Sequence, residues 1–494
     1  MSLEEIIKDK VTFYPQEASV FNDAKFEGWG TSFCWWANRL GYSNQLTEEA
    51  ARLFYGDEGL RLNIVRYNVG GGDDPAHAHI TRTDSEVPGY AVKIHINAVN
   101  GKYEWEYDWD ADINQMNAVK KAMEAYGDGI IVEAFSNSPP YFMTISGCSA
   151  GSFHAYEDNL KKDYYNEFAV YLVDIVEYWC EHGIKFQSIA PMNEPYTDYW
   201  RAYHWKQEGC HFDQGKSQSQ IIVSLKKELM KRNLNNIIIS GTDETSIDVQ
   251  IDSYDSLSDE AKKAISRIDT HSYLGEKRSR LRELAEREGK NLWMSEVDDS
   301  AIAGENAEEM GAALWLAQRI IKDMNELKPS AWILWQVIGS HICSDGYRGK
   351  EDYGMVDVKK GYWGIAVADH DHEKILLTMK YYAMGQFTRY IRPGYTVIPG
   401  DDTSLAAYDS ESKTIVIVAV NQKEKPVEKQ FVLSYFEDAG SRAEVFRTSG
   451  TMENGEKWDR LDDIPVVRRD SINSFVTVLK GNSITTFVVK NGCR

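Results

Sequence analysis

Eight short apolar segments, separated by longer helical patterns, constrain the fold more than any other feature of this chain. They lie at 28–33, 62–66, 129–134, 188–192, 236–240, 268–273, 291–296 and 331–335. Between the third and fourth of them, apolar residues such as Phe168, Tyr171 and Trp179 recur at helical spacing. Strands that alternate with helices form right-handed parallel crossovers, and eight such strands can close into a ring. The pattern therefore predicts an α/β fold, a (β/α)8 TIM barrel.

After residue 390 the pattern changes to short β-prone runs that are separated by turn residues. These runs lie at 414–420, 430–435, 442–448, 474–479 and 483–489. They predict a C-terminal antiparallel β-sandwich. The segment 10–20 is also β-prone, and we expect it to add a strand to the sandwich. The predicted division is a barrel domain at 21–390 and a side domain made of 1–20 plus 391–494.

Charge and composition argue against several kinds of partner. Lys and Arg number 55 and Asp and Glu number 76, so the net charge is -21, which disfavours nucleic acid and anionic membrane surfaces.

No apolar stretch has the length of a transmembrane helix, and the first five residues lack the features of a signal peptide. We expect a cytoplasmic protein from the sequence as written, or a secreted one if a signal was removed. The oligomeric state has no signature in the sequence.

Two glutamates come at the ends of apolar segments of the predicted barrel. Glu194 follows the fourth segment, and Glu296 ends the seventh. A single carboxylate after an apolar run is usually a solvated strand end. In a barrel, however, the carboxyl ends of all strands meet at one mouth, so we expect these two side chains to share a cleft. Two carboxylates on one rigid scaffold are what cleavage of a glycosidic bond needs.

The cysteines leave two interpretations open. Cys34, Cys148, Cys180, Cys210, Cys343 and Cys493 form no Cys-x-x-Cys pair and show no metal-ligand spacing. Buried free thiols are one interpretation. The other is a disulfide between Cys148 and Cys210, because both lie in loops expected at the barrel mouth.

Two further patterns suggest a phosphate or a metal site. The glycines at 70–72 resemble a phosphate cradle, but no Gly-Lys-Ser or Gly-Lys-Thr follows them. The pairs His77/His79 and His370/His372 have a spacing that could ligate a metal. Neither pair ends a predicted strand, and the sequence offers no further ligand set. We therefore predict no catalytic metal and no other cofactor.

Six motifs occur in the order in which one enzyme family has them. They are Phe-Glu-Gly-Trp-Gly-Thr-Ser at 26–32, the strand end at 66–74, Ser-Asn-Ser-Pro-Pro-Tyr-Phe-Met at 136–143, Asn-Glu-Pro at 193–195, Met-Ser-Glu at 294–296, and 385–394. Together they resemble glycoside hydrolase family 30. The segments 34–37, 70–74 and 207–212 are most similar to its group of endo-β-1,6-galactanases. The resemblance implies a retaining hydrolase of clan A whose substrate is an oligosaccharide or polysaccharide.

The resemblance also implies a role for each glutamate. Glu194 would be the acid/base and Glu296 the nucleophile, and retention requires carboxyl groups about 5 to 5.5 Å apart. Glu194 would then be protonated at rest and Glu296 ionised, so their surroundings must separate the two pKa values. Arg66 and Tyr273 are the candidates to hold Glu296 as a carboxylate.

Further residues match positions at which the family binds sugar. Asn193 would bond the sugar 2-hydroxyl, Trp335 would lie beneath the reacting sugar, and Asp73 would bind hydroxyls away from the anomeric centre. The predicted substrate-binding set is completed by Arg66, Asn137, His271 and Tyr273. From the residues alone, Asn193 and Asp73 could instead cap turns, and Trp335 could belong to the core.

Aromatic residues in the predicted mouth loops could line sugar subsites: Trp35, Trp36, Tyr141, Tyr199, Trp200 and Trp205. We expect a retaining β-glycosidase that acts on β-1,6-galactan or its oligosaccharides. Another family activity, as β-glucosidase, β-xylosidase or xylanase, would keep both glutamates and change the loops. A non-catalytic carbohydrate-binding protein is the alternative from a different class, and the intact residue set argues against it.

Overall fold

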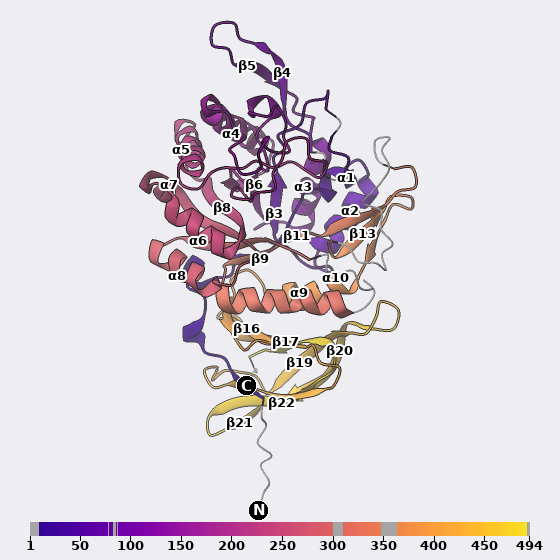
Figure 1. Ribbon diagram of the computed structural model, residues 1–494. Coiled ribbons are helices and arrows are strands. Elements are labelled where there is room, and N and C mark those ends of the chain that lie inside the picture. The colour runs from indigo at the N-terminus through magenta and orange to yellow at the C-terminus, as the bar shows by residue number, and fades with distance from the viewer. Residues whose placement is uncertain are drawn as a thin grey trace, which may run out of the picture.

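A closed barrel of eight parallel strands forms the centre of the molecule (Figure 1). The computed structural model describes residues 9–77, 79–82, 85, 87–299, 310–346 and 363–491. The barrel strands are β2 (Gly28–Ser32), β3 (Ile64–Asn68), β6 (Ile131–Phe135), β7 (Phe186–Ala190), β8 (Ile238–Ser246), β9 (Ile265–Leu274), β10 (Asn291–Val297) and β11 (Ala331–Gln336). Each pairs in parallel with its neighbours, and β10 closes the ring against β9. The predicted (β/α)8 barrel is therefore confirmed.

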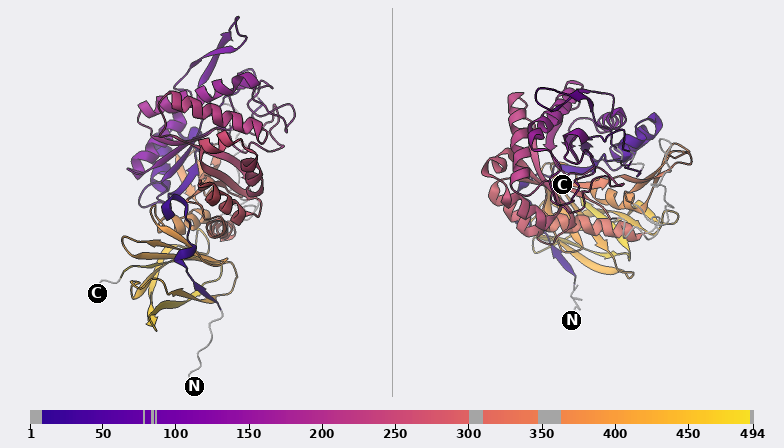
Figure 2. Two further views of the ribbon diagram at one scale, coloured as in Figure 1. Left: turned by 90° about the vertical axis from the view of Figure 1, so that its left-hand side faces the viewer. Right: turned by 45° about the horizontal axis from the view of Figure 1, so that its top comes forward.

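Helices surround the barrel and bury its outer face (Figure 2). They are α1 (Trp36–Leu40), α2 (Asn44–Phe54), α3 (Ile113–Tyr126), α4 (Tyr165–Glu181), α5 (Lys216–Lys231), α6 (Ile247–Ser256), α7 (Asp259–Ala264), α8 (Arg278–Glu288), α9 (Met310–Lys322) and α10 (Met379–Thr388). In α4 the periodic residues Phe168, Tyr171 and Trp179 are buried, as their spacing predicts. Among the described residues, no helix combines the length and apolar character that a membrane crossing requires.

Two stacked sheets lie beyond one end of the barrel (Figure 1). One contains β15 (Thr396–Pro399), β16 (Ser404–Asp409), β17 (Thr414–Asn421), β23 (Ser483–Val489), β19 (Arg442–Ser449) and β20 (Glu456–Pro465). The other contains β1 (Lys10–Thr12), β18 (Val427–Leu433), β22 (Ile472–Leu479) and β21 (Val467–Arg469). The predicted β-sandwich is confirmed, and β1 joins it by pairing in parallel with β18. The exact domain limits stay a prediction.

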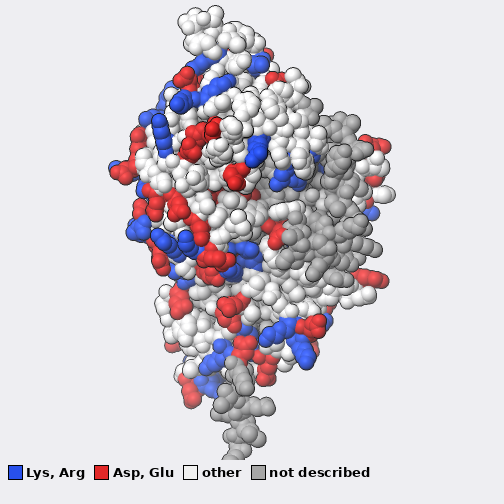
Figure 3. Space-filling model, in the orientation of Figure 1, with Lys and Arg blue, Asp and Glu red and all other residues white. Residues whose placement is uncertain are grey.

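Two smaller sheets decorate the barrel. A hairpin of β4 (Ala91–Ile96) and β5 (Tyr103–Tyr107) follows β3 and projects from the end opposite the sandwich (Figure 2). A second sheet contains β12 (Ile338–Ile342), β13 (Ala366–Asp369) and β14 (Lys374–Leu377). On the face shown in Figure 3, acidic and basic side chains intermingle on the described surface.

The suggested disulfide is wrong, because Cys148 and Cys210 both carry free thiols. Their sulfurs have different partners. Sγ of Cys148 lies 3.2 Å from Nε2 of His79, whereas Sγ of Cys210 donates to the backbone oxygen of His211 at 3.7 Å. Cys493 lies outside the described residues.

Candidate active site

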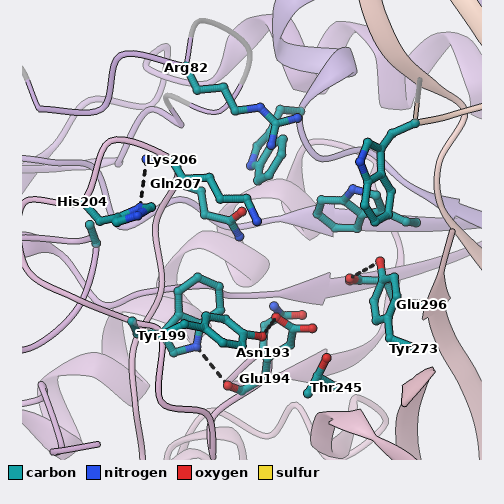
Figure 4. A pocket seen from close by; sticks show the side chains of 15 residues that line it. Arg82, Asn193, Glu194, Tyr199, His204, Lys206, Gln207, Thr245, Tyr273 and Glu296 are labelled. Atoms are coloured by element: carbon teal, nitrogen blue, oxygen red, sulfur yellow. Dashed lines mark hydrogen bonds between the residues drawn. The ribbon is translucent and has the colours of Figure 1, made fainter. Parts of the chain in front are cut away.

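Glu194 and Glu296 share a cavity of about 330 Å³ at the mouth of the barrel. Figure 4 shows them on one side, with Arg82 and Lys206 across the opening. The wall carries several aromatic residues, which are Trp35, Tyr199, Trp200, Tyr273, Trp335 and Trp363. Aromatic walls with a few convergent polar groups are typical of a sugar-binding cavity.

Local irregularities of the backbone aim the two carboxyl groups into this cavity. Glu194 lies four residues beyond β7 and has a φ of 46°, a left-handed conformation that is rare for residues other than glycine. Its backbone N–H donates to the carbonyl of Asp243 at 2.8 Å, and Trp200 donates to its carbonyl at 2.9 Å. Before Glu296, the register of β10 shifts against both neighbouring strands. Such irregularities are common where a strand re-aims a functional side chain.

The two carboxylates are close together and surround one imidazole. One oxygen of Glu194, one oxygen of Glu296 and one nitrogen of His271 all lie within 4.8 Å of one another. Retaining glycosidases hold their carboxyl groups about 5 to 5.5 Å apart, whereas inverting enzymes need roughly 6.5 to 9.5 Å to admit a water. The spacing therefore suits direct attack by a carboxylate on the sugar.

Arg66, on β3, and Tyr273, on β9, both hold Glu296. Nη1 of Arg66 donates to Oε2 of Glu296 at 3.1 Å, and the Tyr273 hydroxyl donates to Oε1 at 3.1 Å. These donors leave the carboxylate with little freedom to turn. A carboxylate held in one orientation has the geometry that a nucleophile needs.

The family is shown by comparison with known proteins. The family model described as O-glycosyl hydrolase family 30 matches residues 23–286. An endo-β-1,6-galactanase of Hypocrea rufa is 32% identical over 422 residues, which cover 81% of this chain and 79% of the relative. The chain belongs to glycoside hydrolase family 30. It is an O-glycosyl hydrolase.

Solved structures agree with this family 30 fold. A conserved exported protein from Bacteroides fragilis superposes with a TM-score of 0.73 at 19% identity, covering 97% of this chain and all of that one. The catalytic domain of a family 30 xylanase C from Talaromyces cellulolyticus superposes with a TM-score of 0.69 at 16% identity, covering 97% and 100% of the two chains. These similarities confirm the barrel with its side sandwich.

Within this family 30 hydrolase, Asp243 is a site residue that the sequence analysis missed. Its carboxylate lies 3.2 Å from Nε2 of His271, accepts from Ser295 at 2.6 Å and also contacts Arg66. The predicted segment stopped at residue 240, whereas β8 continues to Ser246. The polar run that follows the apolar segment was the available signal. Asp243 therefore fixes His271 from the side opposite the two glutamates.

The pKa shifts at the site are opposite to those expected for its two glutamates. Burial raises the pKa of Glu296 to about 7, although the charges of His271 and Arg66 oppose the rise. Burial also raises the pKa of Glu194, but hydrogen bonding to His271 and Tyr199 outweighs it, so the net shift is downward. Burial lowers the pKa of His271, yet Glu296 and Asp243 raise it to about 10. At neutral pH His271 is therefore an imidazolium with a proton on each ring nitrogen. Its Nδ1 lies 3.2 Å from Oε1 of Glu194.

The other predicted substrate-binding residues fall into two groups. Asn193 and Trp335 line the cavity of the family 30 site, and the Trp335 ring packs edge-on against Trp35 with centroids 5.1 Å apart. Asn137 and Asp73 do not line it. Asn137 is buried and donates to Sγ of Cys34 at 3.7 Å, whereas Asp73 lines a neighbouring cavity of about 560 Å³.

The predicted aromatic subsites are also divided between the two cavities. Trp35, Tyr199 and Trp200 line the cavity between the glutamates, and Tyr141 lines the neighbouring one. Trp36 is buried, and Trp205 is 54% exposed. Arg82 and Lys206 also line the first cavity, although neither could be predicted from the sequence because they lie in loops without periodicity.

The glycine loop binds a carboxylate of the same chain. Backbone N–H groups of Gly71 and Gly72 donate to the two oxygens of Glu208 at 3.2 and 2.8 Å. Burial raises the pKa of this carboxyl to about 8. The loop therefore ties together two segments of the mouth.

Proposed function

We propose that this family 30 enzyme cleaves β-1,6-linked galactan or galacto-oligosaccharides with retention of configuration. The observation that carries the mechanism is the spacing of Glu194 and Glu296, whose oxygens lie within 4.8 Å. The relatives support the substrate. Besides the endo-β-1,6-galactanase, an exo-β-1,6-galactobiohydrolase of Bifidobacterium longum is 26% identical over 80% of this chain and 33% of the relative.

In the first step Glu296 attacks the anomeric carbon and Glu194 protonates the departing glycosidic oxygen. The product is a glycosyl ester on Glu296 and a free sugar hydroxyl. In the second step Glu194, now ionised, removes a proton from water, which attacks the same carbon and releases Glu296. Arg66 and Tyr273 orient the nucleophile through the hydrogen bonds described above.

His271 supplies the proton that Glu194 needs at the start of this cycle. Nδ1 lies 3.2 Å from Oε1 of Glu194, and Asp243 holds the other ring nitrogen. Transfer of the Nδ1 proton gives a neutral glutamic acid beside a neutral imidazole. The raised pKa of His271 and the lowered pKa of Glu194 keep this proton on the imidazole in the free enzyme, so its transfer has to accompany departure of the glycosidic oxygen. Asn193 and Trp335, which line the cavity, are placed to contact the sugar.

The test is incubation of the purified enzyme with matched β-1,6-galacto-, β-1,6-gluco- and β-1,4-xylo-oligosaccharides, with products followed by proton NMR. We expect selective cleavage of the galacto-oligosaccharides and initial release of the β-anomer. Release of the α-anomer would reject retention. Preferential cleavage of xylan fragments would keep the mechanism and reject the substrate, an outcome for which a glucuronoxylanase of Bacillus subtilis at 25% identity gives a precedent.

A further inference from the structure

A carboxylate, an imidazole and a thiol converge beside the neighbouring cavity of about 560 Å³, which we name the second cavity. They lie away from Glu194 and Glu296. They belong to Asp73, His79 and Cys148, which we name the thiol cluster. Oδ2 of Asp73 lies 3.0 Å from Nδ1 of His79, and Sγ of Cys148 lies 3.2 Å from Nε2. None of the three lines the cavity between Glu194 and Glu296. The two chemical steps proposed above involve none of them, although the family resemblance implies that Asp73 binds substrate hydroxyls.

The arrangement of the thiol cluster differs from that of a proton relay. As in a relay, Asp73 and Cys148 contact different ring nitrogens of His79, but in a relay the carboxylate and the sulfur lie in line with the ring and are far apart. Here one carboxylate oxygen, one ring nitrogen and the sulfur all lie within 4.8 Å of one another. Three donor atoms this close can converge on one ion, at about 2.0 to 2.3 Å from each, when the side chains shift.

Asp73 and Cys148, which lie on either side of His79, are themselves held by hydrogen bonds from the backbone. The N–H of Ser149 donates to the second oxygen of Asp73 at 3.1 Å. The N–H groups of Ala150 and Tyr203 donate to Sγ of Cys148 at 3.3 and 3.2 Å. Burial raises the pKa of the Cys148 thiol to about 11, and these two donors only oppose that rise; ordered outer partners of this kind nevertheless orient the ligands of metal sites.

We propose that Asp73, His79 and Cys148 bind one divalent ion of the zinc type. The donor set of carboxylate, imidazole and thiolate suits Zn²⁺, and it disfavours Ca²⁺ and Mg²⁺, which prefer oxygen ligands alone. Binding releases the thiol proton of Cys148 to solvent. The two negative ligands then balance the charge of the ion, and water completes the coordination. Asp73 lines the second cavity, which provides the route of entry.

The ion would tie together the loops that form both cavities. Asp73 and His79 follow β3, Cys148 follows β6, and Tyr203, which donates to the sulfur, follows β7. The last two loops also bond directly, because Gly209 donates to the carbonyl of Ser149 at 2.9 Å. The role is therefore structural, and the sequence concealed it because Cys148 lies 69 residues from His79.

The test uses the full-length protein after removal of bound metal by chelation and dialysis. Titration with Co²⁺, a coloured substitute for Zn²⁺, is expected to give one equivalent of binding with a near-ultraviolet sulfur-to-cobalt charge-transfer band. Zn²⁺ is expected to displace the Co²⁺ and to raise the unfolding temperature. Cys148→Ser should abolish the band, and His79→Ala should weaken binding by more than about 100-fold, which exceeds the usual effect of losing an outer partner.

Two matched controls separate the ligand set from general damage. Cys210→Ser removes another buried free thiol, and His77→Ala removes an imidazole that contacts the same Tyr203 ring as His79. Both should keep the band and the affinity. The proposal is overturned if no stoichiometric binding occurs, if Cys148→Ser retains the band, or if His77→Ala weakens binding as much as His79→Ala. Circular dichroism of each variant checks its folding, and activity on galacto-oligosaccharides tests the proposed function separately.

Discussion

The barrel interior and the core of the sandwich are equally buried, but they contain opposite chemistry. Beneath the glutamates, Arg66 pairs with Glu133 at 3.2 Å and Arg267 pairs with Asp269 at 2.6 Å, with side chains that are at most 2% exposed. In the sandwich the ring of Phe431 packs against Phe475 with centroids 5.4 Å apart. One interior is a network of charges, and the other is a hydrocarbon core.

The difference separates two uses of buried volume. Burial of an ion pair usually gains little or no stability, because desolvation offsets the attraction. Burial of an aromatic ring stabilises the fold directly. We therefore infer that the charges in the barrel are kept to hold Glu296, His271 and Asp243 in place, whereas the sandwich supports the fold. Substitutions in the two regions should affect different measurements.

The largest effect is expected at Glu296. The comparison of the barrel interior with the sandwich core predicts that its substitution abolishes activity and leaves the fold intact. Glu296→Ala should lower kcat by more than about 10⁴-fold, because the covalent route disappears. Its unfolding midpoint in urea should stay close to that of the wild type. Burial raises the pKa of Glu296, so burying this carboxyl group costs stability, and the substitution removes that cost. Added azide should form the α-glycosyl azide with this variant. With Glu194→Ala it should form the β-azide. The opposite pair of products would show that Glu194 is the nucleophile and Glu296 the acid/base.

The second prediction concerns the sandwich, where the effect should be on stability alone. Phe431 is fully buried, and Phe431→Ala should lower the free energy of unfolding by about 3 to 5 kcal/mol. Urea denaturation measures the loss, and kcat/KM of the folded fraction should not change. Phe431→Leu is the matched control and should cost much less. A fall in kcat/KM of the folded Ala variant would show that the sandwich contributes to the active site.

The third prediction tests the charge network without removing either glutamate. Asp243→Asn should lower kcat by about 100-fold, since His271 loses the anion that orients it. Because Asp243 contributes to the raised pKa of His271, about 10, the variant should have a lower value. His271 then loses its proton at lower pH, so the alkaline limb of the pH profile should shift downward. If the alkaline limb of the kcat pH profile keeps its position in Asp243→Asn, the proton transfer from His271 is contradicted. A merely structural defect would lower kcat equally at every pH.

The sequence predicted the barrel better than the site, for a physical reason. Strand existence depends on local apolar runs, and all eight appeared as expected. Strand ends depend on tertiary contacts, so β8 was predicted to end before Asp243. In the sandwich, β15 and β21 were missed because they are short, β20 because none of its residues is buried, and β16 because its alanines have low β propensity.

The proton distribution at the site was even less accessible to sequence reasoning. The motifs identified Glu194 and Glu296, but the pKa of each depends on burial and on its distance to His271. Residues at separate strand ends determine these distances jointly. The convergence of Asp73 with His79 and Cys148 likewise arises only when two mouth loops fold together.

The smallest effect is expected from a charge at the surface of the sandwich, where water weakens every ion pair. Arg447 donates to Glu456 at 2.8 Å, and its hydrogen bond lowers the pKa of Glu456 to about 2, with burial opposing. A depressed carboxyl pKa stabilises the fold above the unfolded value, near 4.3, and this contribution disappears as the pH falls through 2. Because water still reaches both side chains, which are 21% and 19% exposed, Glu456→Gln should cost no more than about 1 kcal/mol at pH 7. Urea denaturation of both proteins should give differences that shrink between pH 4.5 and pH 2. A difference that is independent of pH would show that Glu456 acts through packing, as the hydrocarbon core does.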